Sequence, residues 1–171
     1  GRRVALMGTG WLGTLGLVQR LDSLTASPLP GTEGAAMVFW SPDGQFIGFW
    51  AEGKMKKIPV EGGTPLPICD LPGAWSATWN QDNVIVAHTV YLGACAKISA
   101  QSGAVSAGMP LFWPKFLPGG KRLLYTNLDP KIEGNRAYVA ELSTGRETEL
   151  MPTDTQVTFT PDQPGSSLGH L

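Results

Sequence analysis

Short runs of apolar, β-branched and aromatic residues alternate along this chain with polar turns rich in glycine, proline, asparagine and aspartate. In the stretch RAYVAEL, from residue 136, successive residues alternate between two faces: Ala137, Val139 and Glu141 on one, and Tyr138, Ala140 and Leu142 on the other. A period of two is the signal of a half-buried β-strand. Regular short strands separated by turn residues predict an all-β protein.

The strand pattern repeats. VFWSPDGQFIGFW from residue 38, ATWNQDNVIVAHT from 77 and PKFLPGGKRLLYT from 114 each place an aromatic residue before a short polar turn and an apolar run. The anchoring aromatics are Trp40, Trp79 and Phe116, which recur about every 40 residues. A further copy begins at VTFTPDQ, where Phe159 is the matching aromatic residue.

Each copy continues in the same order. The apolar run is followed by a second alternating segment (KMKKIPVEGG, ACAKISAQSG or RAYVAELSTG), a glycine-containing turn and one more short stretch. Four strands in a unit of about 40 residues are typical of a β-propeller blade. We therefore predict a partial β-propeller of three to four antiparallel four-stranded blades, with residues 1–158 as blades and 159–171 as a divergent or truncated tail.

The turns have the chemistry that a hairpin requires. In SPDG, Pro42 presets a turn angle, Asp43 can bond to nearby backbone, and Gly44 tolerates a positive φ. PGG at 118–120 and QDN at 81–83 are variants of the same turn, and the second uses asparagine in place of glycine.

The stretch VALMGTGWLG, from residue 4, contains the pattern G-x-G-x-x-G as Gly8, Gly10 and Gly13. A dinucleotide-binding fold needs a helix directly after these glycines and an acidic residue at the end of a second strand. The acidic residue at the right distance is Glu33, which lies in the turn PLPGTEG. Because GRRVALMG also aligns with GQFIGFWA, from Gly44, we predict that the three glycines form a hairpin loop within a blade and keep the dinucleotide-dependent oxidoreductase as a remote alternative.

Composition and charge limit the classes of binding partner that the sequence favours. The net charge is −1, charged residues make up only 16%, and 22 glycines and 14 prolines indicate a turn-rich chain. The chain has no long run of positive or negative charge that would indicate a nucleic acid or an anionic membrane as partner. No apolar window reaches the length of a membrane span. Lys54 and Lys56 are predicted to share one solvated face of a strand.

Candidate catalytic chemistry is sparse. The two histidines are His88, predicted at a strand end, and His170, in the tail, and the chain has no G-x-S-x-G motif. Kinase motifs, calcium loops and clusters of metal-ligating residues are also missing from the sequence. Cys69 and Cys95 are interpreted as small core residues, with a single disulfide as the alternative outside the cytoplasm. We therefore predict no catalytic, cofactor-binding or metal-binding residue, and place any catalytic domain outside this chain.

Five tryptophans could be read as a carbohydrate- or peptide-binding surface: Trp40, Trp50, Trp75, Trp79 and Trp113. Several recur at fixed places in the repeat, which favours packing between blades. Trp75 and Trp113 lie near turns between copies, and we expect these two to be partly exposed.

The stretch FWSPDGQFIGFWAEGKMKKIPVEGG resembles the TolB-type propeller repeat, a WD-repeat-like blade built around an S-P-D-G turn, and WPKFLPGGKRLLYT resembles another blade of that group. Together with RLDSLTASPLPGTEGA, these stretches are most similar in sequence to the propeller that follows the kinase domain of bacterial serine/threonine kinases. The resemblance implies a non-catalytic, extracytoplasmic interaction or sensor module that binds a protein, peptide or small ligand on its loop face or in its channel. It equally fits a periplasmic TolB-like protein or the gating propeller of a prolyl-oligopeptidase-type peptidase. Since the first residue is glycine, we expect a fragment of a longer protein whose blades form an open arc.

Overall fold

The fold was analysed in a computed structural model, which describes residues 3–10, 13–20, 25–89, 94–106, 111–127 and 135–153. These residues form strands and turns, with no helix among them. The strands in chain order are β1 (Arg3–Gly10), β2 (Gly13–Arg20), β3 (Ala26–Pro28), β4 (Met37–Trp40), β5 (Phe46–Ala51), β6 (Lys54–Pro59), β7 (Leu66–Asp70), β8 (Ser76–Trp79), β9 (Val84–Thr89), β10 (Ala94–Ser99), β11 (Val105–Ser106), β12 (Phe112–Phe116), β13 (Arg122–Asn127), β14 (Asn135–Glu141) and β15 (Glu147–Thr153).

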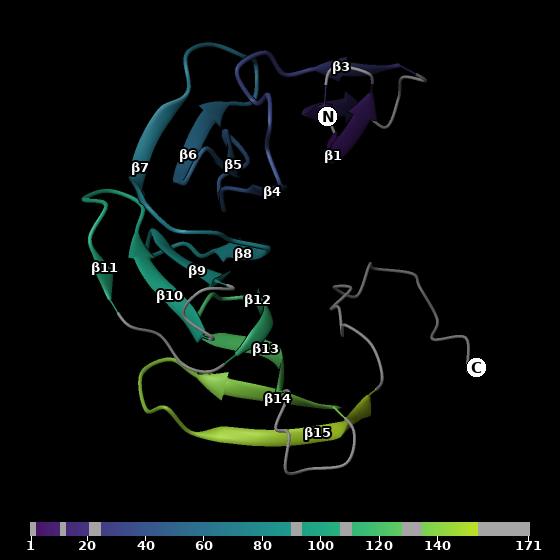
Figure 1. Ribbon diagram of the computed structural model, residues 1–171. Helices are drawn as coiled ribbons and strands as arrows, with labels where there is room; N and C mark the ends of the chain where they lie inside the picture. The colour runs from purple at the N-terminus through teal and green to yellow at the C-terminus, as the bar shows by residue number, and fades with distance from the viewer. Residues whose placement is uncertain are drawn as a thin grey trace.

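The strands form four separate antiparallel sheets, each made of consecutive strands. Blade 1 is β1-β2-β3, blade 2 is β4-β5-β6-β7, blade 3 is β8-β9-β10-β11, and blade 4 is β12-β13-β14-β15. Figure 1 shows the blades stacked along an arc, with β4, β8 and β12 on its inner side and β7, β11 and β15 on its outer side. The prediction of an all-β partial propeller is confirmed, except that blade 1 has three strands in the described residues rather than four.

The predicted repeat is also the structural repeat. Trp40 pairs with Ile47, Trp79 with Ile85, and Phe116 with Leu123, so each anchoring aromatic ends the inner strand of its blade. The further copy predicted at Phe159, the tail 159–171 and the domain boundary at 158 lie outside the described residues.

The turn between β4 and β5 has the predicted chemistry. Asp43 Oδ1 accepts hydrogen bonds from Ser41 Oγ at 2.6 Å and from the backbone N–H of Gln45 at 3.0 Å. These two bonds hold the pKa of Asp43 below its usual value, because they favour the ionised carboxylate. Gly44 has φ of 69°, and in the matching turn of blade 3 Asn83 replaces glycine with φ of 57°.

The core lies between blades, because each sheet is covered by its neighbour. One buried cluster fills each interface between successive blades. The cluster between blades 1 and 2 includes Ile47, Phe49 and Ile58, and the cluster between blades 2 and 3 includes Met55, Trp79 and Ile98. The cluster between blades 3 and 4 includes Leu123, Tyr125 and Cys95. A single four-stranded sheet could not bury two apolar faces alone, which explains why the unit repeats.

Candidate functional site

The glycine-rich stretch forms a β-hairpin, which removes the dinucleotide alternative. Gly13 starts strand β2, where a dinucleotide fold would need a helix, and Gly10 pairs with Gly13 across the hairpin. Gly8 lies inside β1 opposite Leu15, and Gly10 and Gly13 are the paired ends of β1 and β2, so the prediction that the three glycines form the loop is wrong. Its role is to leave space: a Cβ on Gly8 would lie 2.7 Å from Cδ1 of Leu17.

Glu33, the residue that would bind ribose in that alternative, caps a turn. Its Oε1 accepts the backbone N–H of Gly31 at 3.0 Å, and this bond lowers the pKa of the carboxyl. The carboxylate therefore stabilises a local turn, as its place in PLPGTEG suggested.

Of the five tryptophans considered, Trp75 is the one that is largely exposed, and the others are buried or half-buried. Trp79 is buried in the core and meets Phe39 edge-to-face at 6.3 Å, while Trp40 and Trp50 pack against buried clusters. Trp75 is 68% exposed, and Trp113 is half-buried. An aromatic ring as large as that of Trp75 on the surface is a frequent anchor for a partner.

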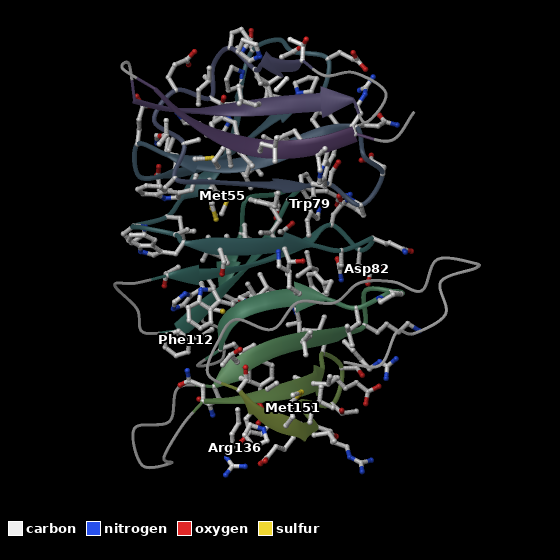
Figure 2. All side chains as sticks on the ribbon, turned by 90° about the vertical axis from the view of Figure 1, so that its right-hand side faces the viewer. Met55, Trp79, Asp82, Phe112, Arg136 and Met151 are labelled. Atoms are coloured by element: carbon white, nitrogen blue, oxygen red, sulfur yellow. The ribbon has the colours of Figure 1, made fainter. Side chains whose placement is uncertain are left out.

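Trp75 lies just before β8, on the side of the stacked blades where β8 and β12 begin and β9 ends. We name the aromatic residues on this side the aromatic end: Trp75, His88, Phe112 and Trp113. The backbone N–H of Trp75 donates to the carbonyl of His88 at 3.1 Å. The His88 ring meets Phe112 at 4.5 Å, and Phe112 meets Trp113 at 6.4 Å, both edge-to-face. Figure 2 shows Phe112 at the left-hand side of the stacked blades and Asp82, in a hairpin turn, at the right-hand side.

The backbone of blade 4 is irregular at this end. Trp113 has φ of 50°, a left-handed conformation that a bulky side chain rarely adopts. The register of β12 against β13 shifts between Phe112 and Lys115, so one extra residue lies in the inner strand. Such strain costs on the order of 1–3 kcal/mol and often marks a functional position.

Two buried polar atoms at the aromatic end lack hydrogen bonds. Ser76 is directly opposite His88 in the β8–β9 ladder, so both side chains lie on the same face, and Ser76 Oγ and His88 Nδ1 are buried without partners. Burial lowers the pKa of His88, because it disfavours the charged imidazolium. The hydroxyl is not hydrogen-bonded to the imidazole, so the pair lacks the contact by which a histidine activates a serine nucleophile.

Other candidate chemistry is structural where the structure describes it. Cys69 and Cys95 are free thiols in β7 and β10, so the disulfide alternative is wrong. Lys54 pairs with Asp70, and Lys56 pairs with Glu52 at 2.6 Å, consistent with the predicted polar face. In the described ranges no three His, Cys, Asp or Glu side chains gather as a metal site, and no helix is long and apolar enough to cross a membrane.

Sequence reasoning predicted the partial exposure of Trp75 and Trp113 and the strand-end position of His88, but it missed that Phe112 contacts both His88 and Trp113. A signal was present: Trp75 and Phe112 each precede their anchoring aromatic, Trp79 and Phe116, by four residues. Equivalent positions of successive blades lie on the same side of a propeller, so this spacing could have placed Trp75 and Phe112 on one side.

Comparison with known proteins identifies the fold. A protein described as a putative TolB from Agrobacterium tumefaciens superposes with a TM-score of 0.73 at 13% identity, over 87% of this chain and 61% of that one. The β-propeller domain of the Trilobed protease from Pyrococcus furiosus gives 0.57 at 14% identity, over 88% of this chain and 53% of that domain. An acylaminoacyl peptidase gives 0.55 at 13% identity, over 89% of this chain and 31% of the peptidase.

These likenesses establish a TolB-like β-propeller architecture. No family model matches the sequence, and no curated protein matches it. The chain spans less than two thirds of each of these three structural relatives.

Proposed function

We propose that this chain is a non-catalytic interaction module, a set of propeller blades from a larger protein, that binds a protein or peptide through the aromatic end. The observation that carries the proposal is Trp75, a large ring that is 68% exposed and held by a backbone bond to His88. Binding energy at protein interfaces concentrates on a few tryptophan, tyrosine and arginine anchors.

The chemistry of the aromatic end favours a neutral, partly apolar partner. Its rings offer surfaces on which an apolar side chain of a partner can pack. An extended peptide segment with an aromatic or aliphatic side chain fits this surface, because that side chain can pack against the exposed rings.

The parent protein we propose is a membrane-anchored bacterial serine/threonine kinase, with the blades on the extracytoplasmic side. What supports this choice is the resemblance of the sequence to the propellers that follow such kinase domains. The coding sequence on either side of this chain tests it: we expect a kinase domain and a membrane span upstream.

The second candidate is the gating propeller of a prolyl-oligopeptidase-type peptidase. It is favoured by the structural likeness to an acylaminoacyl peptidase and to the Trilobed protease propeller. A hydrolase domain with a G-x-S-x-G motif downstream would decide for it.

Binding at the aromatic end is tested with peptides selected from a random library on the wild-type chain. We expect Trp75→Ala to weaken binding of the selected peptides at least 10-fold by calorimetry, as loss of a central anchor does. Leu66→Ala is the matched control, because Leu66 is an exposed apolar side chain, 47% accessible, on the outer strand β7 of another blade. Equal affinity of the Trp75→Ala and wild-type chains would contradict the proposal.

A further inference from the structure

A pocket of about 320 Å³ lies between blades 1 and 2, which form the upper part of the stack in Figure 2. Blade 1 contributes the start of β1, the end of β2 and the segment around β3, and blade 2 contributes the turn that follows β6. In that turn Val60 donates its N–H to the carbonyl of Gln45, next to the β4–β5 turn. The pocket therefore lies on the side where β4 and β6 end, opposite the aromatic end.

One wall of the pocket is apolar and belongs to the core. Val18 and Val60 pack against the buried cluster between blades 1 and 2, and Leu29 is a member of that cluster. Pro28 and Pro30 flank Leu29 and limit the backbone freedom of this segment. An aliphatic side chain of a ligand can therefore pack on a wall that is already ordered.

Hydrogen bonds to β2 hold the same wall in place. The N–H of Leu29 donates to the carbonyl of Gly16 at 3.0 Å. The N–H of Gly16 donates to Thr32 Oγ1 at 2.9 Å, and this hydroxyl donates to the carbonyl of Leu29 at 2.7 Å. Such a preformed wall lowers the ordering cost of binding a small molecule.

The pocket also carries one positive and one negative side chain. Nη1 of Arg3 lies 2.6 Å from Oε1 of Glu61, and the Glu61 side chain is 76% exposed. An exposed ion pair contributes little to stability, so Glu61 can leave Arg3 at low cost. The planar guanidinium of Arg3 can then bind the carboxylate of a ligand through two parallel hydrogen bonds, and the released Glu61 can accept an ammonium group.

We propose that this pocket binds a free α-amino acid with an aliphatic side chain, such as leucine. The carboxylate of the amino acid pairs with Arg3, its ammonium group pairs with Glu61, and its side chain packs on the apolar wall. The hydroxyl-bearing residues Thr25 and Ser27 also line the pocket and give it a polar edge. This site is separate from the aromatic end and does not depend on peptide binding there.

Charge and size favour this class of ligand. Arg3 and Glu61 are the ionisable side chains among the described residues that line the pocket, so their charges cancel. A simple anion or cation would be attracted by one of them and repelled by the other, whereas a zwitterion satisfies both. A volume of about 320 Å³ is at the small end of the range for ligand pockets and suits one small molecule.

Calorimetry of the full chain with leucine, isoleucine and valine tests the site. We expect at least one of the three to bind saturably with a Kd below about 1 mM. The amide of that amino acid lacks the carboxylate and its N-acetyl derivative lacks the ammonium group, so each should bind about 10-fold more weakly or worse. Absence of saturable binding by all three amino acids, or equal binding of the amide, would overturn the proposal.

Substitutions assign the two charges. Arg3→Gln should weaken binding of the amino acid and remove the difference between the acid and its amide, because glutamine carries no charge. Glu61→Gln should in the same way remove the difference between the amino acid and its N-acetyl derivative. Differences that persist in these variants would contradict the assigned roles.

Two control variants separate this site from other parts of the chain. Glu52→Gln is the matched control, because Glu52 is also 76% exposed and pairs with Lys56 outside the pocket, so the affinity for the amino acid should not change. Trp75→Ala should also bind the amino acid as the wild type does. A loss of affinity in the Trp75→Ala chain would place the amino acid at the aromatic end and overturn the proposed site.

Methyl NMR locates the ligand without any substitution. The bound amino acid should shift the methyl signals of Val18, Leu29 and Val60, which line the pocket. The methyl signals of Val86 and Leu123, buried between blades 3 and 4, should stay in place. Shifts confined to Val86 and Leu123 would overturn the proposal.

Discussion

At the residue scale, the side chain of Asn80 forms hydrogen bonds both within its own turn and to the next blade. It is 3% exposed, its Oδ1 accepts the N–H groups of Asp82 and Val84, and its Nδ2 donates to the carbonyl of Gly120 in blade 4 at 2.9 Å. It occupies the repeat position of Ser41, whose shorter side chain organises only its own turn.

We expect Asn80→Ala to lower the free energy of unfolding by about 2–4 kcal/mol, because one buried and two partly buried backbone groups lose their partners. Asn80→Ser is the matched variant, since serine at this place can still organise the turn but cannot reach blade 4. It should cost about 1 kcal/mol. Urea unfolding measures both, and an Asn80→Ser chain as stable as the wild type would show that the bond to Gly120 contributes nothing.

His88 makes the stability of the folded chain depend on pH, and the shift of its pKa gives the direction of that dependence. Its pKa is lowered in the folded state because the ring is buried, so the unfolded chain binds more protons just below the unfolded pKa of about 6.5. Stability from this group is complete above that pH and is lost as the pH falls from about 6.5 through the folded pKa.

We expect His88→Phe to flatten the dependence of the urea midpoint on pH between about 7 and 5, since the substituted ring cannot be protonated. His170→Ala, in the tail, should leave the wild-type dependence unchanged. A His88→Phe chain that follows the wild-type curve would assign the dependence to other groups.

At the element scale, the position of a strand in its blade decides how reactive its side chains are. Cys95 lies in β10, is buried, and donates from Sγ to the carbonyl of Leu111. Burial raises its pKa to about 12. Cys69 lies in the outer strand β7, is half-buried, and has its pKa raised by burial and by the charge of Asp70.

Both thiols should therefore react slowly with a disulfide reagent near neutral pH, because the thiolate is the nucleophile. We expect Cys69 to react measurably in the folded chain and Cys95 only after addition of denaturant. Cys69→Ser and Cys95→Ser chains assign the two rates. Similar rates in the folded state would mean that β10 opens as readily as β7.

Features set within one blade could be predicted from the sequence, whereas contacts between blades could not. Turns such as 41–44 and anchors such as Trp79 depend on local chemistry and on repetition, so the sequence predicted them. The contact of His88 with Phe112 depends on how two blades stack and on a bulge in β12, and neither has a local signature. The role of Gly8 was partly missed for the same reason, because the side chain above it comes from the opposite strand.

At the scale of the whole molecule, each blade protects the face of the next. Removing residues 1–31 would take away blade 1 and uncover Ile47, Phe49 and Ile58, which are almost fully buried. Stability in stacked repeats is a sum over units and their interfaces, so loss of an end unit weakens its neighbour.

We expect this deletion to lower the urea midpoint and to increase fluorescence of a dye that binds exposed apolar surface. Deletion of 164–171 is the control, and it should change neither property. An unchanged midpoint after loss of residues 1–31 would show that blade 1 contributes no stacking energy.

The bonds between blades have a consequence for the gene. Among the described residues, polar contacts from one blade to the next involve side chains. Lys57 donates to the carbonyl of Ala100, the N–H of Phe116 donates to Thr78, and Arg3 forms an ion pair with Glu61. Every ladder closes inside its own sheet. An in-frame duplication or loss of about 40 codons therefore changes the number of blades without shifting the register of any that remain, so this architecture can change length through ordinary recombination errors.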